Sequence, residues 1–67
     1  MLNYSEALLL LRSARDMRCT TWERGGFVRM VRNPNGVPQL KRYRLNGTVE
    51  SFVPTDAEQL TYAWEVA

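Results

Sequence analysis

The spacing of apolar residues predicts a helix over residues 3–14. Apolar side chains recur there every three or four residues, which is the pattern of a helix face that packs on a core: Tyr4, Ala7, Leu8, Leu11 and Ala14. Asn3 is a suitable N-cap, and Glu6 three residues later completes a capping-box pattern. The segment therefore carries both a start signal and a buried stripe.

Leu9 and Leu10 lie outside that stripe, so the same helix is apolar on nearly all sides. A chain of 67 residues has too little surface of its own to cover such a helix completely. We therefore expect a homo-oligomer, a dimer or a tetramer, whose interface covers Leu9 or Leu10. The alternative is that these leucines are simply exposed.

Alternation of apolar and polar residues predicts two strands that begin at Met17 and end near Arg32, the second of them over residues 27–32. A turn over Glu23–Gly26 joins them, because glycine easily adopts the positive φ values of hairpin turns. In the first strand, Met17 and Cys19 would face one side of the sheet and Trp22 the other. Beside the turn, Trp22 is either a surface for a ligand or a plug of the small core.

Two further turns contain Asn-Gly pairs, which tolerate the left-handed region of backbone conformation. These turns, at residues 33–36 and at Asn46-Gly47, bound two more predicted strands, over residues 39–45 and 48–53. If Asn46-Gly47 is a two-residue turn, Tyr43 faces Glu50 across the hairpin.

The end of the chain combines a short helix with a last strand of the sheet. Thr55 followed by Glu58 is a second capping-box pattern, which predicts a helical turn there. The final residues alternate large with small or charged side chains, so three of them would point inward: Tyr62, Trp64 and Val66. The predicted fold is α+β, with one main N-terminal helix, a small antiparallel sheet and a short second helical turn in a single domain.

The composition excludes several classes of protein. With 45% hydrophobic and 24% charged residues, the chain is an ordinary globular domain. Its single Cys19 excludes an internal disulfide, and the lack of histidine leaves a zinc site few ligands and a nucleophilic triad no usual base. We expect neither a cofactor nor an enzyme. Apolar runs fall short of the roughly 20 residues that span a membrane, and no signal-peptide pattern begins the chain, so we expect a soluble intracellular protein.

The net charge of +2 is small, but eight of the nine basic residues are arginine. The planar guanidinium group matches phosphate oxygens and stacks on aromatic rings. Codon bias in a GC-rich genome is the alternative explanation. The basic residues are therefore compatible with a phosphate-containing ligand without establishing one.

The two ends of the chain resemble a family of small phage proteins, the Thoeris anti-defence proteins of the second type. Tyr4–Leu8 is similar to the aromatic-x-Glu-Ala-Leu opening of that family, and Trp22 with the following Gly-Gly-aromatic turn is similar to its first hairpin. Phe52–Thr55 is similar to its aromatic-x-Pro-Ser/Thr turn, and Trp64–Val66 to its last residues. The chain has Ala14, Cys19 and Ala63 where the family pattern has a glycine, an arginine and an acid.

The resemblance implies a sponge for immune signals in the cytoplasm of an infected bacterium. Proteins of this family are small oligomers that bind cyclic ADP-ribose-type signals, and in some members cyclic oligonucleotides, so that the host effector is not triggered. The partner would be a small nucleotide, sequestered without being cleaved. Neither a membrane nor a stable complex with nucleic acid is expected.

A nucleotide requires aromatic faces for its base and N–H donors for its phosphates. The aromatic residues that we assign to such a site are Tyr4, Trp22, Phe27 and Tyr43. Arg18 is assigned as the phosphate donor, and the further possible donors are Arg29, Arg42 and Arg44. At helix starts, where backbone N–H groups favour anions, lie Ser5, Thr55 and Asp56. Asp56 would repel a phosphate, so it would cap the helix or meet a ribose hydroxyl. For each aromatic residue, a place in the core is the alternative.

Two other functions are compatible with the same residues. A phage inhibitor would bind a host protein directly, through a sheet edge or through the arginine-rich face. A small binder of single-stranded nucleic acid would use the arginines and aromatic rings for phosphates and bases.

Overall fold

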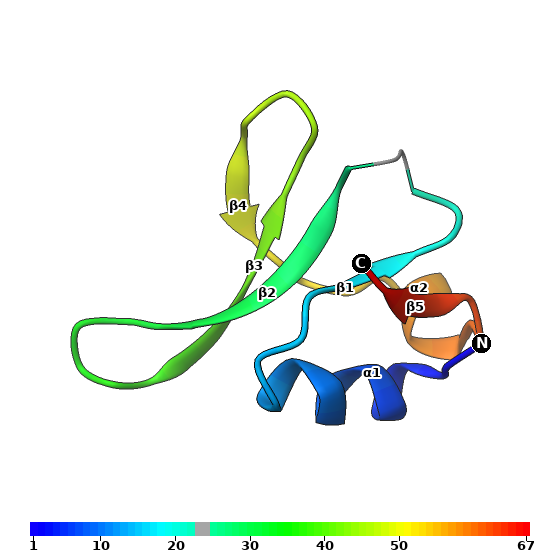
Figure 1. Cartoon of the computed structure of the whole chain (residues 1–67), viewed down its shortest axis with the longest axis horizontal. Helices are drawn as coiled ribbons and strands as arrows, with labels where there is room; N and C mark the ends of the chain where they lie inside the picture. Colours follow the sequence, from blue (N-terminus) through cyan, green and yellow to red (C-terminus); the bar gives the residue numbers. More distant parts are fainter. Residues whose placement is uncertain (23–24) are drawn as a thin grey trace.

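A five-stranded antiparallel sheet organises the part of the chain that the computed structural model describes, residues 1–22 and 25–67. Its strands are β1 (Met17–Cys19), β2 (Phe27–Arg32), β3 (Pro38–Tyr43), β4 (Val49–Ser51) and β5 (Trp64–Val66). They lie side by side in the order β4-β3-β2-β1-β5. The main helix, α1 (Tyr4–Arg12), packs against β1, β2 and β5, and the short α2 (Asp56–Leu60) contacts α1 (Figure 1). The predicted α+β class is confirmed, with shorter elements than the sequence indicated.

Both ends of the chain are tied to the sheet and lie near β5 (Figure 1). Leu2 exchanges two backbone hydrogen bonds with Trp64, with N···O distances of 2.9 and 3.1 Å. The Ala67 N–H donates to the Asp16 carbonyl at 2.8 Å. The prediction that the last residues form a strand of the sheet is therefore confirmed.

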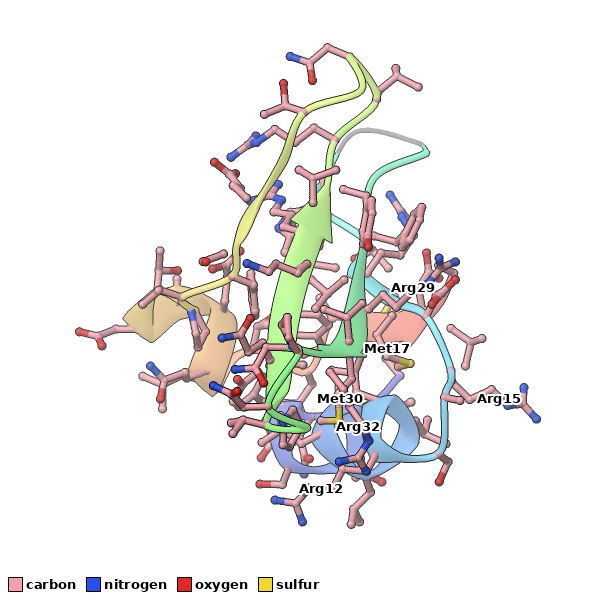
Figure 2. All side chains as sticks on the ribbon, turned by 90° about the vertical axis from the view of Figure 1, so that its left-hand side faces the viewer. Arg12, Arg15, Met17, Arg29, Met30 and Arg32 are labelled. Atoms are coloured by element: carbon pink, nitrogen blue, oxygen red, sulfur yellow. The ribbon has the colours of Figure 1, made fainter. Side chains whose placement is uncertain are left out.

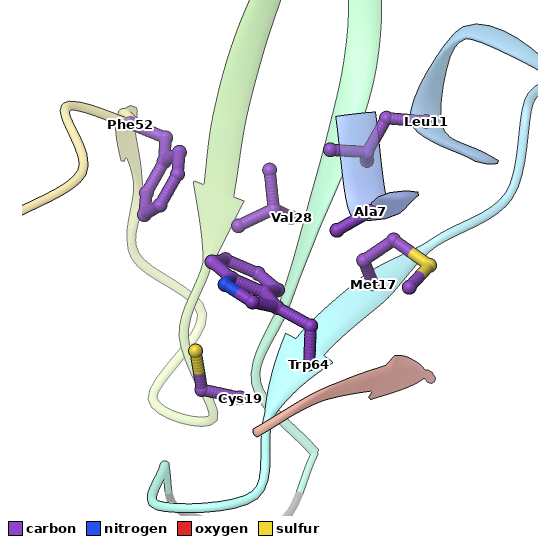
Figure 3. Packing of buried hydrophobic residues seen from close by; sticks show 7 residues of the cluster. All are labelled: Ala7, Leu11, Met17, Cys19, Val28, Phe52 and Trp64. Atoms are coloured by element: carbon purple, nitrogen blue, oxygen red, sulfur yellow. The ribbon is translucent and has the colours of Figure 1, made fainter. Parts of the chain in front are cut away.

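Trp64 lies at the centre of the core and is 0% exposed. Figure 3 shows it among the other buried hydrophobic side chains, which are Ala7, Leu11, Met17, Cys19, Val28 and Phe52. The inward orientation predicted for the last strand holds for Trp64 but is wrong for Tyr62 and Val66, which are 70% and 47% exposed. Because β5 begins only at Trp64, the alternation of a strand does not extend back to Tyr62. Val66 lies at the end of β5, which is an edge strand of the sheet.

The hairpins β2–β3 and β3–β4 close with the same kind of loop. Gly36 has φ +80°, and its N–H donates to the Asn33 carbonyl at 2.8 Å. Gly47 has φ +88°, and its N–H donates to the Arg44 carbonyl at 3.0 Å. This geometry is that of a three-residue loop, in which a tight turn is followed by a left-handed glycine.

The loop at Gly47 corrects the predicted register of β3 and β4. Tyr43 pairs with Val49 rather than with Glu50, and Glu50 lies opposite Arg42. A shift of one residue exchanges the two faces of a strand. Glu50 therefore lies on the same side of the sheet as Arg42, and this side also carries the core residue Val28, which pairs with Arg42 from β2.

The start of α1 follows the prediction. The Asn3 side chain accepts from the Glu6 N–H at 2.8 Å, and the Glu6 carboxylate accepts from the Asn3 N–H at 3.0 Å. The predicted stripe is buried at Ala7 and Leu11. These contacts confirm the capping box and the central part of the stripe.

The end of α1 differs from the prediction, because Ala14 is exposed and lies beyond the helix with φ +66°. The Ala14 N–H donates to the Leu11 carbonyl at 3.1 Å, and the Arg15 N–H donates to the Leu10 carbonyl at 3.0 Å. This pair of bonds is the Schellman arrangement, which places one residue in the left-handed region. The prediction of Ala14 as a core residue is wrong, because the chain reverses there.

The predicted turn over residues 23–26 lies partly outside the described residues. On the described side, Gly25 has φ +88°, and a Cβ atom on it would lie 2.9 Å from Leu45 Cδ1. A side chain at this position would therefore be strained and would also meet the neighbouring hairpin.

We expect the substitution Ala14→Gly to raise the free energy of unfolding by about 0.5–1 kcal/mol. Removing Cβ relieves the strain of the left-handed conformation, which stabilises the folded state by roughly 1–2 kcal/mol. The greater conformational freedom of glycine stabilises the unfolded chain, and this offsets roughly 0.4–1 kcal/mol of the gain. Urea unfolding followed by circular dichroism measures the difference.

Ala57→Gly is the matched control, because Ala57 is exposed within α2 and glycine there should cost about 0.5–1 kcal/mol. Equal losses of stability in the two variants would contradict the left-handed end of α1.

Candidate functional site

Trp22 reaches the core side of the sheet because β1 ends early. After Cys19, the Thr20 N–H donates to the Ala63 carbonyl at 2.8 Å, and the Trp22 N–H donates back to the Cys19 carbonyl at 3.0 Å. The indole then packs edge-on against Trp64, with ring centroids 5.4 Å apart. The predicted placement of Trp22 on the face opposite Cys19 is wrong, because a turn replaces the last residues of the strand.

Glu58 holds both indole rings of the chain. Its Oε2 accepts from Trp22 Nε1 at 3.0 Å, and its backbone carbonyl accepts from Trp64 Nε1 at 2.9 Å. The second carboxylate oxygen accepts from the Thr55 N–H at 2.9 Å, within the capping box of α2. Burial and the negative charge of Glu58 also raise the pKa of Tyr4. Glu58 therefore takes part in the capping box of α2 and bonds both tryptophans.

Arg42 covers the Trp22 ring. Its Cζ lies 3.9 Å from the ring centroid, which is the geometry of a cation–π contact. Within the part of the chain that the structure describes, Arg42 has no carboxylate within 4.0 Å, and its buried Nε has no hydrogen-bond partner. The charge of the Arg42 guanidinium is thus stabilised by its cation–π contact with the Trp22 ring.

A small cavity opens beside this stack. It has a volume of about 230 Å³ and is lined by Thr21, Trp22, Gly26, Arg42, Arg44 and Leu45. Typical sites for whole small molecules occupy roughly 300–1,000 Å³, so this one suits a fragment such as one phosphate group or one ring. Arg44 donates from Nε to Glu50 Oε1 at 2.6 Å. The lining therefore offers two guanidinium groups, a threonine hydroxyl and an indole.

The thiol of Cys19, whose carbonyl accepts from the Trp22 N–H, is not activated. Cys19 is buried, and burial, followed by the charge of Glu58, raises its pKa to about 11. A thiol with that pKa stays protonated at neutral pH and is a poor nucleophile. The arrangement thus suits binding better than covalent chemistry at Cys19.

Phe27 and Tyr43 lie on the other face of the sheet, apart from Trp22. Their rings stack with centroids 4.9 Å apart at 15°, and Arg29 Cζ lies 5.1 and 5.4 Å from the two centroids. Arg29 also makes two hydrogen bonds to Asp16, at 3.0 and 2.9 Å, which lower the pKa of that carboxyl group. In Figure 2, Arg29 lies apart from α1, whereas Met30 lies beside the helix. The structure therefore separates aromatic residues that the sequence assigned to one site.

Arg18 holds the turn that carries Trp22. Its guanidinium bonds the Glu65 carboxylate and the Trp22 carbonyl, the latter at 2.9 Å, and the side chain is only 16% exposed. These contacts satisfy the η nitrogens of Arg18 inside the protein. The arginines that line the cavity are Arg42 and Arg44, which the sequence offered only among several arginines.

The remaining predicted site residues lie away from the cavity beside Trp22. Tyr4 and Ser5 line a second, more open hollow of about 380 Å³ together with Asn3, Gln59, Leu60 and Tyr62. Thr55 caps α2 by accepting from the Glu58 N–H at 3.2 Å, and Asp56 is exposed in its first turn. The predicted residues are thus divided among the cavity beside Trp22, the opposite face of the sheet, the second hollow and the start of α2.

Comparison with known proteins gives no match, either to a protein-family model or to a curated protein. Among residues 1–22 and 25–67, no helix has the length and apolar character needed to cross a membrane. The same residues contain no group of three metal-ligating side chains placed to hold an ion. The cavity geometry is therefore the basis on which a function can be argued.

The signal that could have identified the cavity lies in β3. Arg42 and Arg44 are two residues apart, so a strand presents both on one face. The predicted register already placed them together, but nothing in the sequence indicated that a turn would bring Trp22 onto that same face. Thr21, Gly26 and Leu45 were missed for the same reason.

The two leucines predicted at an oligomer interface differ in exposure. Leu9 is 62% exposed, whereas Leu10 is partly buried against the core of its own chain. Of the two, Leu9 is therefore the residue that is available to a second copy. The homo-oligomer itself stays a prediction.

We expect the substitution Leu9→Glu to dissociate the oligomer, because it places a charge in an apolar interface while keeping good helix propensity. Light scattering of the unmodified chain should give at least twice the monomer mass of 7.8 kDa, and the variant should give the monomer. Leu60→Glu, at a residue 79% exposed on α2, serves as the control. A monomeric unmodified chain would contradict the prediction.

Proposed function

We propose that this protein binds a nucleotide immune signal, a cyclic ADP-ribose isomer or a cyclic oligonucleotide, and sequesters it without cleaving it. The observation that carries the proposal is the guanidinium of Arg42 stacked on Trp22 at the wall of a cavity that Arg44 also lines. A nucleotide combines anionic phosphates with planar bases, and these groups complement guanidinium N–H donors and flat cationic or aromatic faces.

The proposed binding mode places a phosphate of the ligand against Arg42. Hydrogen bonds between ionised groups are among the strongest that proteins make, particularly where the donor is partly buried. Thr21 can add a hydroxyl donor, and a base can lie on the open side of the guanidinium. Because the cavity holds only about 230 Å³, the rest of a cyclic ligand would extend outside it, past the exposed lining residues Thr21 and Leu45.

Sequestration demands tight binding and nothing more. Its efficiency depends on affinity and on the concentration of protein, with no requirement for a general base or nucleophile. A small chain without histidine can meet this demand. The resemblance to the phage sponge family supports the same proposal, and the cytoplasm of an infected bacterium is the corresponding location.

Direct binding of a host protein is the second candidate, and the edge strand β4 favours it. All three residues of β4 are exposed, and Val49 is 52% exposed. An exposed edge can accept an extended strand of a partner through backbone hydrogen bonds. Such a complex would not depend on Arg42.

We expect Arg42→Gln to weaken binding of the responding nucleotide by about 10- to 100-fold, since it removes one charged hydrogen-bonding group of roughly 1.5–3 kcal/mol. Thermal-shift screening of ADP-ribose, cyclic ADP-ribose isomers and cyclic dinucleotides identifies the nucleotide, and calorimetric titration gives the affinity. Release of intact ligand on heating shows that it is not cleaved.

Arg12→Gln is the matched control, because it removes the same charge from an exposed residue in the last turn of α1. Circular dichroism confirms that both variants fold. Equal affinity of Arg42→Gln and the unmodified chain would overturn the proposal, as would a lack of response to every nucleotide. Capture of one host protein by the unmodified chain and by Arg42→Gln alike would support the second candidate instead.

A further inference from the structure

The two arginines at the cavity differ in their partners. Arg44 donates to the Glu50 carboxylate at 2.6 Å, whereas Arg42 lies on the Trp22 ring. Among the described residues, no carboxylate approaches Arg42 within 4.0 Å. Arg44 is therefore already compensated, and the charge of Arg42 is the one that an anionic ligand meets.

Glu50 could have compensated Arg42 instead. The register places Glu50 directly opposite Arg42, where cross-strand side chains normally interact. Its carboxylate nevertheless bonds Arg44, which lies diagonally from it, while Trp22 holds the Arg42 guanidinium. Arg42, Arg44 and Glu50 together carry one net positive charge, and the Glu58 carboxylate, which accepts from Trp22 Nε1, adds a negative charge close by.

That balance discriminates between kinds of phosphate. A phosphodiester carries one negative charge, whereas a terminal phosphomonoester carries about 1.5–2 near neutral pH. The guanidinium groups attract both kinds of phosphate, but the additional negative charge of the phosphomonoester is also repelled by Glu50. At separations of several ångströms in partly solvated surroundings, one extra unit charge changes affinity roughly three- to tenfold.

We propose that Glu50 is a specificity-determining residue, which restrains Arg44 and so makes the cavity favour phosphodiesters over phosphomonoesters. The inference rests on the proposed function, because it concerns the same cavity. Glu50 and Arg44 side chains are 44% and 45% exposed, so salt should screen the effect. The ligands that this arrangement favours are cyclic oligonucleotides, whose phosphates are diesters, and cyclic ADP-ribose isomers, whose diphosphate has no terminal phosphomonoester.

The test compares two probes with the same base, cyclic adenosine monophosphate and adenosine monophosphate, in calorimetric titrations slightly above neutral pH. The unmodified chain should bind the cyclic probe at least as tightly as the linear one. Glu50→Gln should raise the affinity for the linear probe about three- to tenfold more than that for the cyclic probe. High salt should reduce this difference.

Asp16→Asn is the matched control, because Asp16 forms an ion pair with Arg29, which lies on the face of the sheet opposite Arg42. It should leave the ratio of the two affinities unchanged. Arg44→Gln provides a second variant with the opposite expectation, since it leaves the Glu50 charge uncompensated and should weaken the linear probe more than the cyclic one.

The outcomes separate the two proposals. If cyclic oligonucleotides or ADP-ribose isomers bind but Glu50→Gln and Arg44→Gln leave the ratio of the two probes unchanged, the role of Glu50 is overturned and the sponge proposal stands. If a larger nucleotide binds but neither probe does, the role of Glu50 is likewise overturned and the sponge proposal stands. Absence of binding by every nucleotide overturns both.

Discussion

The hydrogen bonds from two indole N–H groups to Glu58 connect the parts of this structure. Trp64 donates to the Glu58 carbonyl at 2.9 Å, and Trp22 donates to its carboxylate at 3.0 Å. The first bond satisfies the polar atom of the most central core residue, whose burial would otherwise be costly. The second brings the Trp22 turn over the same side of the sheet. Loss of the Glu58 side chain would therefore remove one of the two hydrogen bonds of the α2 capping box and the bond that holds the Trp22 indole.

The cavity follows from this constraint together with the register of β3 and β4. Once Trp22 is held on the core side, the neighbouring position of β3 on that face is Arg42, and the indole is an available partner for its guanidinium. A three-residue loop at Gly47 then places Glu50 on the same face, where it bonds Arg44. The arrangement of charged side chains at the cavity thus depends on the conformation of the Gly47 loop as well as on which residues are present.

Local signals in the sequence predicted much of the fold. The capping boxes at Asn3 and Thr55 fix both helix starts, and the apolar spacing identifies Ala7 and Leu11 as buried. These features depend on residues three or four apart, so a single segment contains all the information needed. The α+β class follows from one such helix and the alternating segments after it.

The parts that were not predicted depend on choices between similar local conformations. Asn46-Gly47 supports either a two-residue or a three-residue loop, and the difference exchanges the faces of β4. Trp22 follows a strand that could have continued, but its N–H bonds the Cys19 carbonyl of its own segment, which closes a turn. Ala14 occupies a left-handed position where glycine is the usual residue. Without a glycine there, the sequence did not indicate where α1 ends.

The central claim is that a nucleotide binds at Arg42 and Trp22. Nuclear magnetic resonance tests it most directly, because the Trp22 and Trp64 indole N–H signals report on the cavity and on the core of the same molecule. Titration with the nucleotide that stabilises the protein should shift the Trp22 signal until saturation while the fully buried Trp64 signal stays nearly unchanged. Saturable binding that leaves Trp22 unchanged and perturbs Phe27 and Tyr43 would contradict the claim.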